Sequence, residues 1–315
     1  MALTRYTNGV ESFGVPVIGS GQIPTTTGSY FFVDSSTGSA GNDGTSPTSA
    51  LNTVDNAVNK CTANKGDVIV CMPGHAETIS SATSLVLDVA GVTVIGLGTG
   101  NKRPTFTYAT STAASVVVSA DNVTVANCRF IGNLDNVAAA FTLGAAKYFE
   151  LRGNDFIDNS AALHFITILV TGTTDNAVDG LRVVGNRWWG LALAPNAFIS
   201  ILGDTDLLYV ADNLAVMAVT DDEGHFITIT ADTLRAAEIT RNKLICTGST
   251  GAAVGIFLTG SSTDNTGIVS YNLVSSLDTT AELIATAGTG LTFIENYYTG
   301  TADASGKLWP AVDGA

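Results

Sequence analysis

The sequence predicts an all-β fold, a parallel β-helix solenoid of about nine coils with three strands in each coil. Two observations predict this class. A phrase of the form apolar-x-apolar-x-x-Asn recurs six times between residues 149 and 296. The composition is rich in Thr, Ser, Asn and Gly and has only 13% charged residues, which suits strands and turns better than helices. A repeat of about 28 residues with loops of irregular length is typical of a stacked solenoid.

The asparagine that ends the phrase is expected at one corner of each coil. Three earlier copies keep the apolar pair but end in Pro73, Leu97 and Cys128, and the nine end positions lie 24, 31, 26, 32, 27, 29, 30 and 24 residues apart. Asn tolerates the left-handed backbone angles that a tight corner needs, and its amide both donates and accepts hydrogen bonds. We therefore expect a structural ladder rather than a ligand site. Its members are Cys128, Asn154, Asn186, Asn213, Asn242, Asn272 and Asn296.

Composition also argues against several classes of function. The net charge is −14 with 14 scattered basic residues, which argues against a nucleic-acid partner, because phosphate binding needs a basic face. No apolar run approaches the roughly 18 residues of a membrane span, and the N-terminus lacks a secretory signal. The four cysteines show no zinc spacing and are expected to be free thiols, so we expect no metal and no cofactor.

The elements follow one another in a simple order. Residues 1–29 predict an extended arm, and residues 30–65 a strand, a turn-rich stretch and one capping helix. The helix is expected over residues 49–61, with Ser49 as its cap, because apolar residues recur there at spacings of three and four. Its expected role is to cover the open end of the first coil. The β-helix should then occupy residues 66–300, followed by a tail over residues 301–315.

The opening of the chain resembles a known superfamily. Tyr30–Asp34, Gly41–Pro47, Gly66–Val70 and Pro73–Glu77, with the intervening helix, look like the start of right-handed parallel β-helix proteins of the pectin-lyase-like superfamily. The chain is most similar to the short β-helix proteins of bacteriophage virions. This resemblance implies a right-handed coil and side-by-side assembly as a homotrimer. It is specific for the fold and weak for activity, because that superfamily contains lyases, hydrolases and inert structural proteins.

A strand ahead of each phrase carries a second signal. His164–Ile168 and His225–Ile229 have the same five residues, and Ala197–Ile201 between them is close to both. This sheet is apolar on both faces, whichever way its side chains alternate, and such a surface marks an interface. If the isoleucines point inward, the exposed stripe and its neighbours are Phe165, Thr167, Phe198, Ser200, Phe226 and Thr228. In the opposite phase the isoleucines are exposed instead.

Catalytic residues are harder to identify. Asp221, Asp222 and Glu223 form the best acidic cluster, and Asp135 and Asp158 fall in equivalent loops. Hydrolysis of a polysaccharide needs two suitably spaced carboxylates. Acidic loop tips on such an acidic chain are more often solvated turns, and the basic catalytic residue of the superfamily has no match. We therefore assign no catalytic residue.

These observations favour a non-enzymatic structural protein of a bacteriophage particle. It would be a capsid-decoration or fibre-like component that docks on other virion proteins through its N-terminal arm and self-associates side by side. The expected location is the virion. Two alternatives stay open: a tailspike-like or lyase-like enzyme that degrades polysaccharide, and a non-catalytic module that binds a surface glycan through the phenylalanine stripe.

Overall fold

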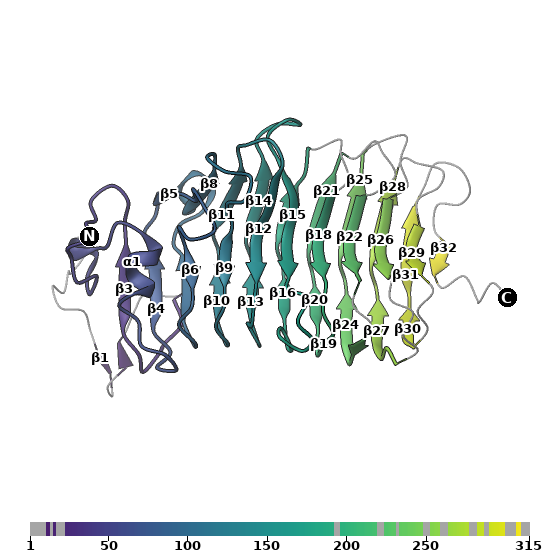
Figure 1. The fold of residues 1–315 in the computed structure, drawn as a ribbon, viewed down its shortest axis with the longest axis horizontal. Helices are drawn as coiled ribbons and strands as arrows, with labels where there is room; N and C mark the ends of the chain where they lie inside the picture. The colour runs from purple at the N-terminus through teal and green to yellow at the C-terminus, as the bar shows by residue number, and fades with distance from the viewer. Residues whose placement is uncertain are drawn as a thin grey trace, which may run out of the picture.

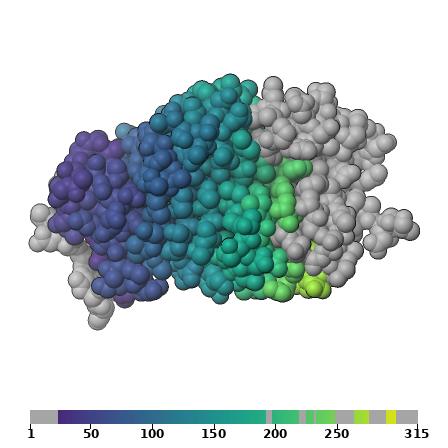
Figure 2. All heavy atoms as spheres, viewed as in Figure 1, coloured from purple at the N-terminus to yellow at the C-terminus, as the bar shows by residue number. Residues whose placement is uncertain are grey.

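A computed structural model shows the chain as an elongated stack of β-strands (Figure 1). The structure describes residues 11–12, 15–16, 23–191, 196–218, 224–230, 233–247, 253–258, 264–276, 282–286, 290–299 and 307–309. Colours change steadily along the stack in the space-filling view (Figure 2), so coils that are neighbours along the rod are also neighbours in the chain.

Three long sheets run along the stack. Sheet 1 contains β3 (Tyr30–Val33), β4 (Val68–Cys71), β7 (Thr93–Gly96), β10 (Thr124–Ala126), β13 (Glu150–Arg152), β16 (Arg182–Val184), β20 (Tyr209–Ala211), β24 (Ala237–Thr240), β27 (Gly267–Ser270) and β30 (Leu291–Ile294). Sheet 2 contains β5 (Ala76–Thr78), β8 (Thr105–Tyr108), β11 (Arg129–Gly132), β14 (Asp155–Asp158), β17 (Arg187–Trp189), β21 (Leu214–Met217), β25 (Lys243–Cys246), β28 (Leu273–Ser276), β31 (Asn296–Thr299) and β32 (Lys307–Trp309). Sheet 3 contains β6 (Val86–Leu87), β9 (Val116–Val118), β12 (Val137–Leu143), β15 (Phe165–Thr171), β18 (Asn196–Ile201), β22 (Gly224–Ile229), β26 (Ala253–Leu258) and β29 (Glu282–Thr286).

Neighbouring strands in these sheets are parallel, except that β32 runs antiparallel to β31. Two short pairs lie outside them: β1 (Glu11–Ser12) with β2 (Val15–Pro16), and β19 (Thr205–Asp206) with β23 (Leu234–Arg235). The predicted all-β parallel solenoid is therefore confirmed. Its complete turns are slightly fewer than nine, because sheets 1 and 2 have ten strands each and sheet 3 has only eight.

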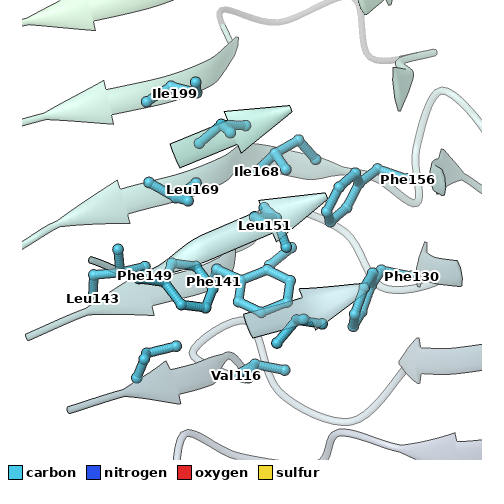
Figure 3. Packing of buried hydrophobic residues seen from close by; sticks show 14 of the residues in the cluster. Val116, Phe130, Phe141, Leu143, Phe149, Leu151, Phe156, Ile168, Leu169 and Ile199 are labelled. Atoms are coloured by element: carbon cyan, nitrogen blue, oxygen red, sulfur yellow. The ribbon is translucent and has the colours of Figure 1, made fainter. Parts of the chain in front are cut away.

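Side chains from the three sheets meet in one continuous core. Phe130 and Phe156 of sheet 2 stack on each other at 5.2 Å between ring centroids, and Phe141 of sheet 3 meets Phe130 edge to face at 4.9 Å. Leu151 of sheet 1 closes the third side (Figure 3). Equivalent positions of successive coils therefore pack against one another along the rod, and this packing holds the stack together.

The N-terminal end carries a shorter helix than predicted. Helix α1 spans Val54–Val58, its N-cap is Thr53, and a 3₁₀ turn (η1) occupies Pro47–Ser49. A second such turn (η2) spans Gly100–Lys102. The expected helix over residues 49–61 with Ser49 as its cap is wrong, because Ser49 already ends the 3₁₀ turn. Val54 and Val58 of α1 are buried in the core beside β3, β4 and β6. No helix in the described ranges is long and apolar enough to cross a bilayer.

The last residues of the predicted arm, from Ile23 onward, pack against the outer face of sheet 1. Ile23 packs against a small cluster on the outer face of sheet 1 that includes Val70 and Ile95. Thr26 Oγ1 donates a hydrogen bond to the carbonyl of Gly66 at 2.5 Å. The arm is thus anchored before β3 begins. The other apolar residues of the predicted arm lie outside the described side chains.

The ladder asparagines bridge adjacent coils between sheets 1 and 2. The Oδ1 of Asn186 accepts hydrogen bonds from the backbone N–H of Asn154 at 3.0 Å and from its Nδ2 at 3.1 Å. The Nδ2 of Asn186 also donates to the carbonyl of Leu151 at 2.7 Å. Cys128 heads the ladder through its backbone N–H, which donates to Asn154 Oδ1. The pattern repeats at Asn213, Asn242, Asn272 and Asn296. These amides are buried and bonded within the stack, which makes them structural.

The left-handed residue of each corner precedes the ladder asparagine. The φ angle is +63° at Gly153, +65° at Gly185 and +58° at Asp212. The expectation that Asn itself takes these angles is therefore wrong. The residue before each ladder asparagine takes the left-handed angles that turn the chain. The Asn amide points inward and forms the ladder hydrogen bonds.

Gly185→Val will destabilise the fold through the backbone alone. A Cβ at Gly185 meets no heavy atom within 4 Å, so the cost is that of a left-handed residue with a side chain, about 1–2 kcal/mol. Urea denaturation measures the free energy of unfolding. Gly41→Val is the matched control, because an added Cβ there meets only Ser39 Oγ at 3.9 Å and no left-handed angle is involved. Equal losses for the two variants would contradict this account.

Candidate interaction surface

The predicted phenylalanine stripe of sheet 3 is not on the surface. Phe165, Phe198 and Phe226 are all buried. Phe165 meets Tyr108 edge to face at 5.0 Å between centroids, and Phe198 stacks on Phe226 at 5.3 Å and on Trp188 at 6.3 Å. The expectation of an exposed stripe built from these three residues is therefore wrong. Neither a partner nor a sugar can stack on rings that lie in the core.

The cause is a break in the alternation of side chains along the strands. Strict alternation would expose one of each pair of neighbours, yet Phe198 and Ile199 are both buried, as are Phe226 and Ile227. Phe198 packs against the sheet 2 aromatics Phe156 and Trp188, Phe226 stacks on Phe198, and Ile199 and Ile227 are buried beside them. Partial exposure is restricted to the small polar members of the predicted set, Thr167, Ser200 and Thr228.

The acidic residues singled out from the sequence do not form a site within the described ranges. Asp221, Asp222 and Glu223 lie outside the described residues. Asp135 is exposed, and its carboxylate accepts a hydrogen bond from Asn136. In the described part of the chain no three His, Cys, Asp or Glu side chains are grouped so that they could hold a metal ion.

Asp158 is enclosed rather than accessible. Its carboxylate accepts hydrogen bonds from the backbone N–H of Leu191 at 2.9 Å and of Phe165 at 3.1 Å, and from Trp188 Nε1 at 3.4 Å. Burial raises the pKa of Asp158 above its ordinary value, and these hydrogen bonds offset part of that rise. His164 beside it is buried too, with Nε2 3.1 Å from Asn136 Oδ1. This cluster ties together neighbouring turns and has no open side for a substrate.

A shallow groove of about 440 Å³ lies on the outer side of sheet 1 near its corner with sheet 2. Its lining residues are Ile95, Ala126, Asn127, Arg152, Gly153, Val184 and Gly185. Arg152 is the single charged residue among them, and its Nε is 3.7 Å from Glu150 Oε2. The lining thus lacks the pair of carboxylates that glycoside hydrolysis needs.

The outer face of sheet 2 carries a column of apolar side chains. They come from five successive strands and are in register with one another. The members of this apolar column are Ile131, Ile157, Trp189, Val216 and Ile245. All five are at least partly exposed, and Trp189 is 47% exposed. At about 4.8 Å between strands the column is about 20 Å long.

A charged column runs beside it on the same face. Arg129, Asp155 and Arg187 are in register on β11, β14 and β17. Leu214 has the next position on β21, and Lys243 the one after it on β25. Arg187 Nε donates to Asp155 Oδ1 at 3.0 Å, and Nη1 of Arg103 approaches Asp155 Oδ2 at 2.6 Å. Four cations and one carboxylate leave this face with a net charge of +3, on a chain whose net charge is −14.

Sequence reasoning missed this face, although the chain carries a signal for it. The inward residue of each third strand is followed directly by another apolar residue. The pairs are Phe130–Ile131, Phe156–Ile157, Trp188–Trp189, Ala215–Val216 and Leu244–Ile245. Two consecutive apolar residues in a strand place one on each face, so the pairs predict an apolar outer surface.

Comparison with known proteins extends the account of the fold. Searches found no matching family model and no matching curated protein. Among solved structures, a rhamnogalacturonan lyase is similar, with 12% identity, a TM-score of 0.51, and coverage of 86% of this chain and 74% of that one. A GH136 lacto-N-biosidase from Eubacterium ramulus matches with 9% identity, a TM-score of 0.36, and coverage of 86% and 68%. At 12% identity the similarity to the rhamnogalacturonan lyase shows the parallel β-helix fold alone.

Proposed function

We propose that the chain is a non-enzymatic structural protein of a bacteriophage particle whose copies associate side by side through the outer face of sheet 2. The apolar column carries this proposal. Each Å² of apolar surface removed from water contributes about 25 cal/mol, from which the entropy cost of association is subtracted. A contiguous exposed strip of isoleucine, valine and tryptophan is unusual on a monomer and typical of a protein interface.

The interior suits a structural role. Buried ladder amides and stacked aromatic rings connect coil to coil, so the outer face of sheet 2 sits on a rigid support. Rigid surfaces lose little conformational entropy on association. The column is therefore preorganised for a second rod lying alongside.

Assembly in threes and location in a virion rest on the resemblance to phage β-helix proteins. In this proposal the homotrimer docks on capsid or tail proteins through the N-terminal arm, as a decoration or fibre-like component. The arm enters the fold at Ile23, which is packed on sheet 1 and leaves the face of sheet 2 for contact between copies.

A glycan-binding module is the second candidate, because one observation favours it. Trp189 is 47% exposed and lies two residues along the same strand from Arg187, whose guanidinium is ion-paired with Asp155. An apolar ring next to a few charged hydrogen-bonding groups is the usual composition of a ligand site. The similarity in fold to a rhamnogalacturonan lyase supports a link to polysaccharide. The enzyme alternative would depend on Asp221, Asp222 and Glu223.

Replacing Trp189 with serine tests the proposal. We expect the wild-type chain to be an oligomer at micromolar concentration and Trp189→Ser to dissociate to the monomer, because the substitution removes the largest apolar side chain of the column. Light scattering coupled to size exclusion measures the mass. Ile268→Ser is the matched control, since Ile268 is 44% exposed but lies on sheet 1.

An unchanged oligomer in Trp189→Ser would overturn the assembly proposal. So would a wild-type monomer that binds a glycan on an array and loses that binding in Trp189→Ser. The latter result would establish the second candidate in its place.

A further inference from the structure

We propose that Arg103, Arg129 and Arg187 form a binding site for an oxyanion at the edge of sheet 2. Three guanidinium groups converge there on the single carboxylate of Asp155. The cluster therefore holds three positive charges against one negative charge, a net charge of +2. The cluster lies on the same face of sheet 2 as the apolar column but contains none of its residues.

The guanidinium groups of Arg129 and Arg103 are incompletely hydrogen-bonded within the described part of the chain. The nearest carboxylate oxygen to Arg129 is Asp155 Oδ2, 3.9 Å from Nη2, which is too long for a hydrogen bond. The Nε of Arg129 is buried without a hydrogen-bond partner among the described residues, and so is the Nε of Arg103. Both oxygens of Asp155 already face other guanidinium groups, Oδ1 that of Arg187 and Oδ2 that of Arg103.

Two other ion pairs of the described surface are balanced, whereas Glu150 faces two arginines, Arg152 and Arg182. Arg241 donates to both carboxylate oxygens of Asp212, at 2.8 and 2.9 Å, and Lys147 Nζ donates to Asp179 at 3.0 Å. Those pairs match one cation with one anion, and both cations are more than 40% exposed. The side chains of Arg103 and Arg129 are only 13% and 21% exposed, so water screens their mutual repulsion less. Excess positive charge held in this way favours a bound anion.

The chemistry of the ligand follows from the guanidinium fork. Planar N–H donors match the oxygens of phosphate and carboxylate groups and bind them in a bidentate manner. An anion that reaches Arg129 from the open side of the face would gain donors from Arg187, which is half exposed. We infer an oxyanion of either type, a phosphate group or a carboxylate group.

Isothermal titration of the full chain with inorganic phosphate and, separately, with sodium acetate tests the site, at constant ionic strength set with chloride. We expect saturable binding of at least one of these anions and an affinity at least tenfold lower in Arg129→Gln. Binding of phosphate alone or of acetate alone would support the site and would show whether its ligand group is a phosphate or a carboxylate. Arg235→Gln is the matched control, because Arg235 pairs with Asp206 far from this cluster in the sheet order.

Arg187→Gln is a second variant. Because the Arg187 side chain is exposed, we expect this variant to fold normally and to bind each anion more weakly than the wild type. Absence of saturable binding of both anions to the wild-type chain would overturn the proposal. Equal affinity in the wild type, Arg129→Gln and Arg187→Gln would also overturn it.

Discussion

Asn213→Ala will lower the free energy of unfolding by about 3–5 kcal/mol. The substitution removes the acceptor for the N–H and Nδ2 of Asn186 and the donor to the carbonyl of Val183. Each buried polar group left without a partner costs about 1–3 kcal/mol. Urea denaturation followed by circular dichroism measures the change.

Asn159→Ala is the control for this substitution. The Asn159 amide also bonds between coils, to Asn133 Oδ1 at 2.8 Å, but it is exposed. Water replaces an exposed hydrogen bond, so we expect a loss within about 0.5 kcal/mol. A small loss in Asn213→Ala, similar to that of the control, would mean that the ladder does not stabilise the stack.

Phe198→Ala will destabilise the chain by a comparable amount, about 3–5 kcal/mol, because it opens a cavity in a packed core. Phe198 is fully buried, and its ring contacts those of Trp188 and Phe226. Thermal or urea unfolding reports the loss. If Phe198 lay on an exposed stripe, the same substitution would lower the free energy of unfolding by no more than about 0.5 kcal/mol. The measurement therefore distinguishes a buried ring from an exposed one.

Ile166→Ala serves as the control, since Ile166 is in the same sheet and 37% exposed. We expect it to unfold almost as the wild type does. A near-wild-type stability of Phe198→Ala would contradict the buried aromatic stack and would indicate that Phe198 lies on the surface.

The stacking of the coils could be predicted from sequence because the ladder position of each coil tolerates few residue types. A ladder position needs a side chain that accepts from one coil and donates to the next, and Asn154, Asn186 and Asn213 repeat that requirement. A loop of any length can lie between two ladder positions, because each ladder asparagine fixes which residues of the adjoining strand point inward. The phrase therefore identified the strands of sheet 1 despite spacings that range from 24 to 32 residues.

The surface could not be predicted equally well, because the strict alternation of inward and outward side chains fails in sheet 3. Phe198 and Ile199 are neighbours and both buried, which no alternating pattern describes. The outer face of sheet 2 was missed for the opposite reason. There the alternation holds, and Trp188 in the core beside Trp189 outside is its plain consequence. The extent of α1 also depends on tertiary contacts, since five residues are too short to be stable alone.

The solution mass of the wild-type chain at micromolar concentration tests the central claim most directly. If the apolar column of sheet 2 is an interface between copies in a trimer, light scattering will give three times the 32.3 kDa of one chain. A mass of 32.3 kDa that persists as the concentration rises would contradict it.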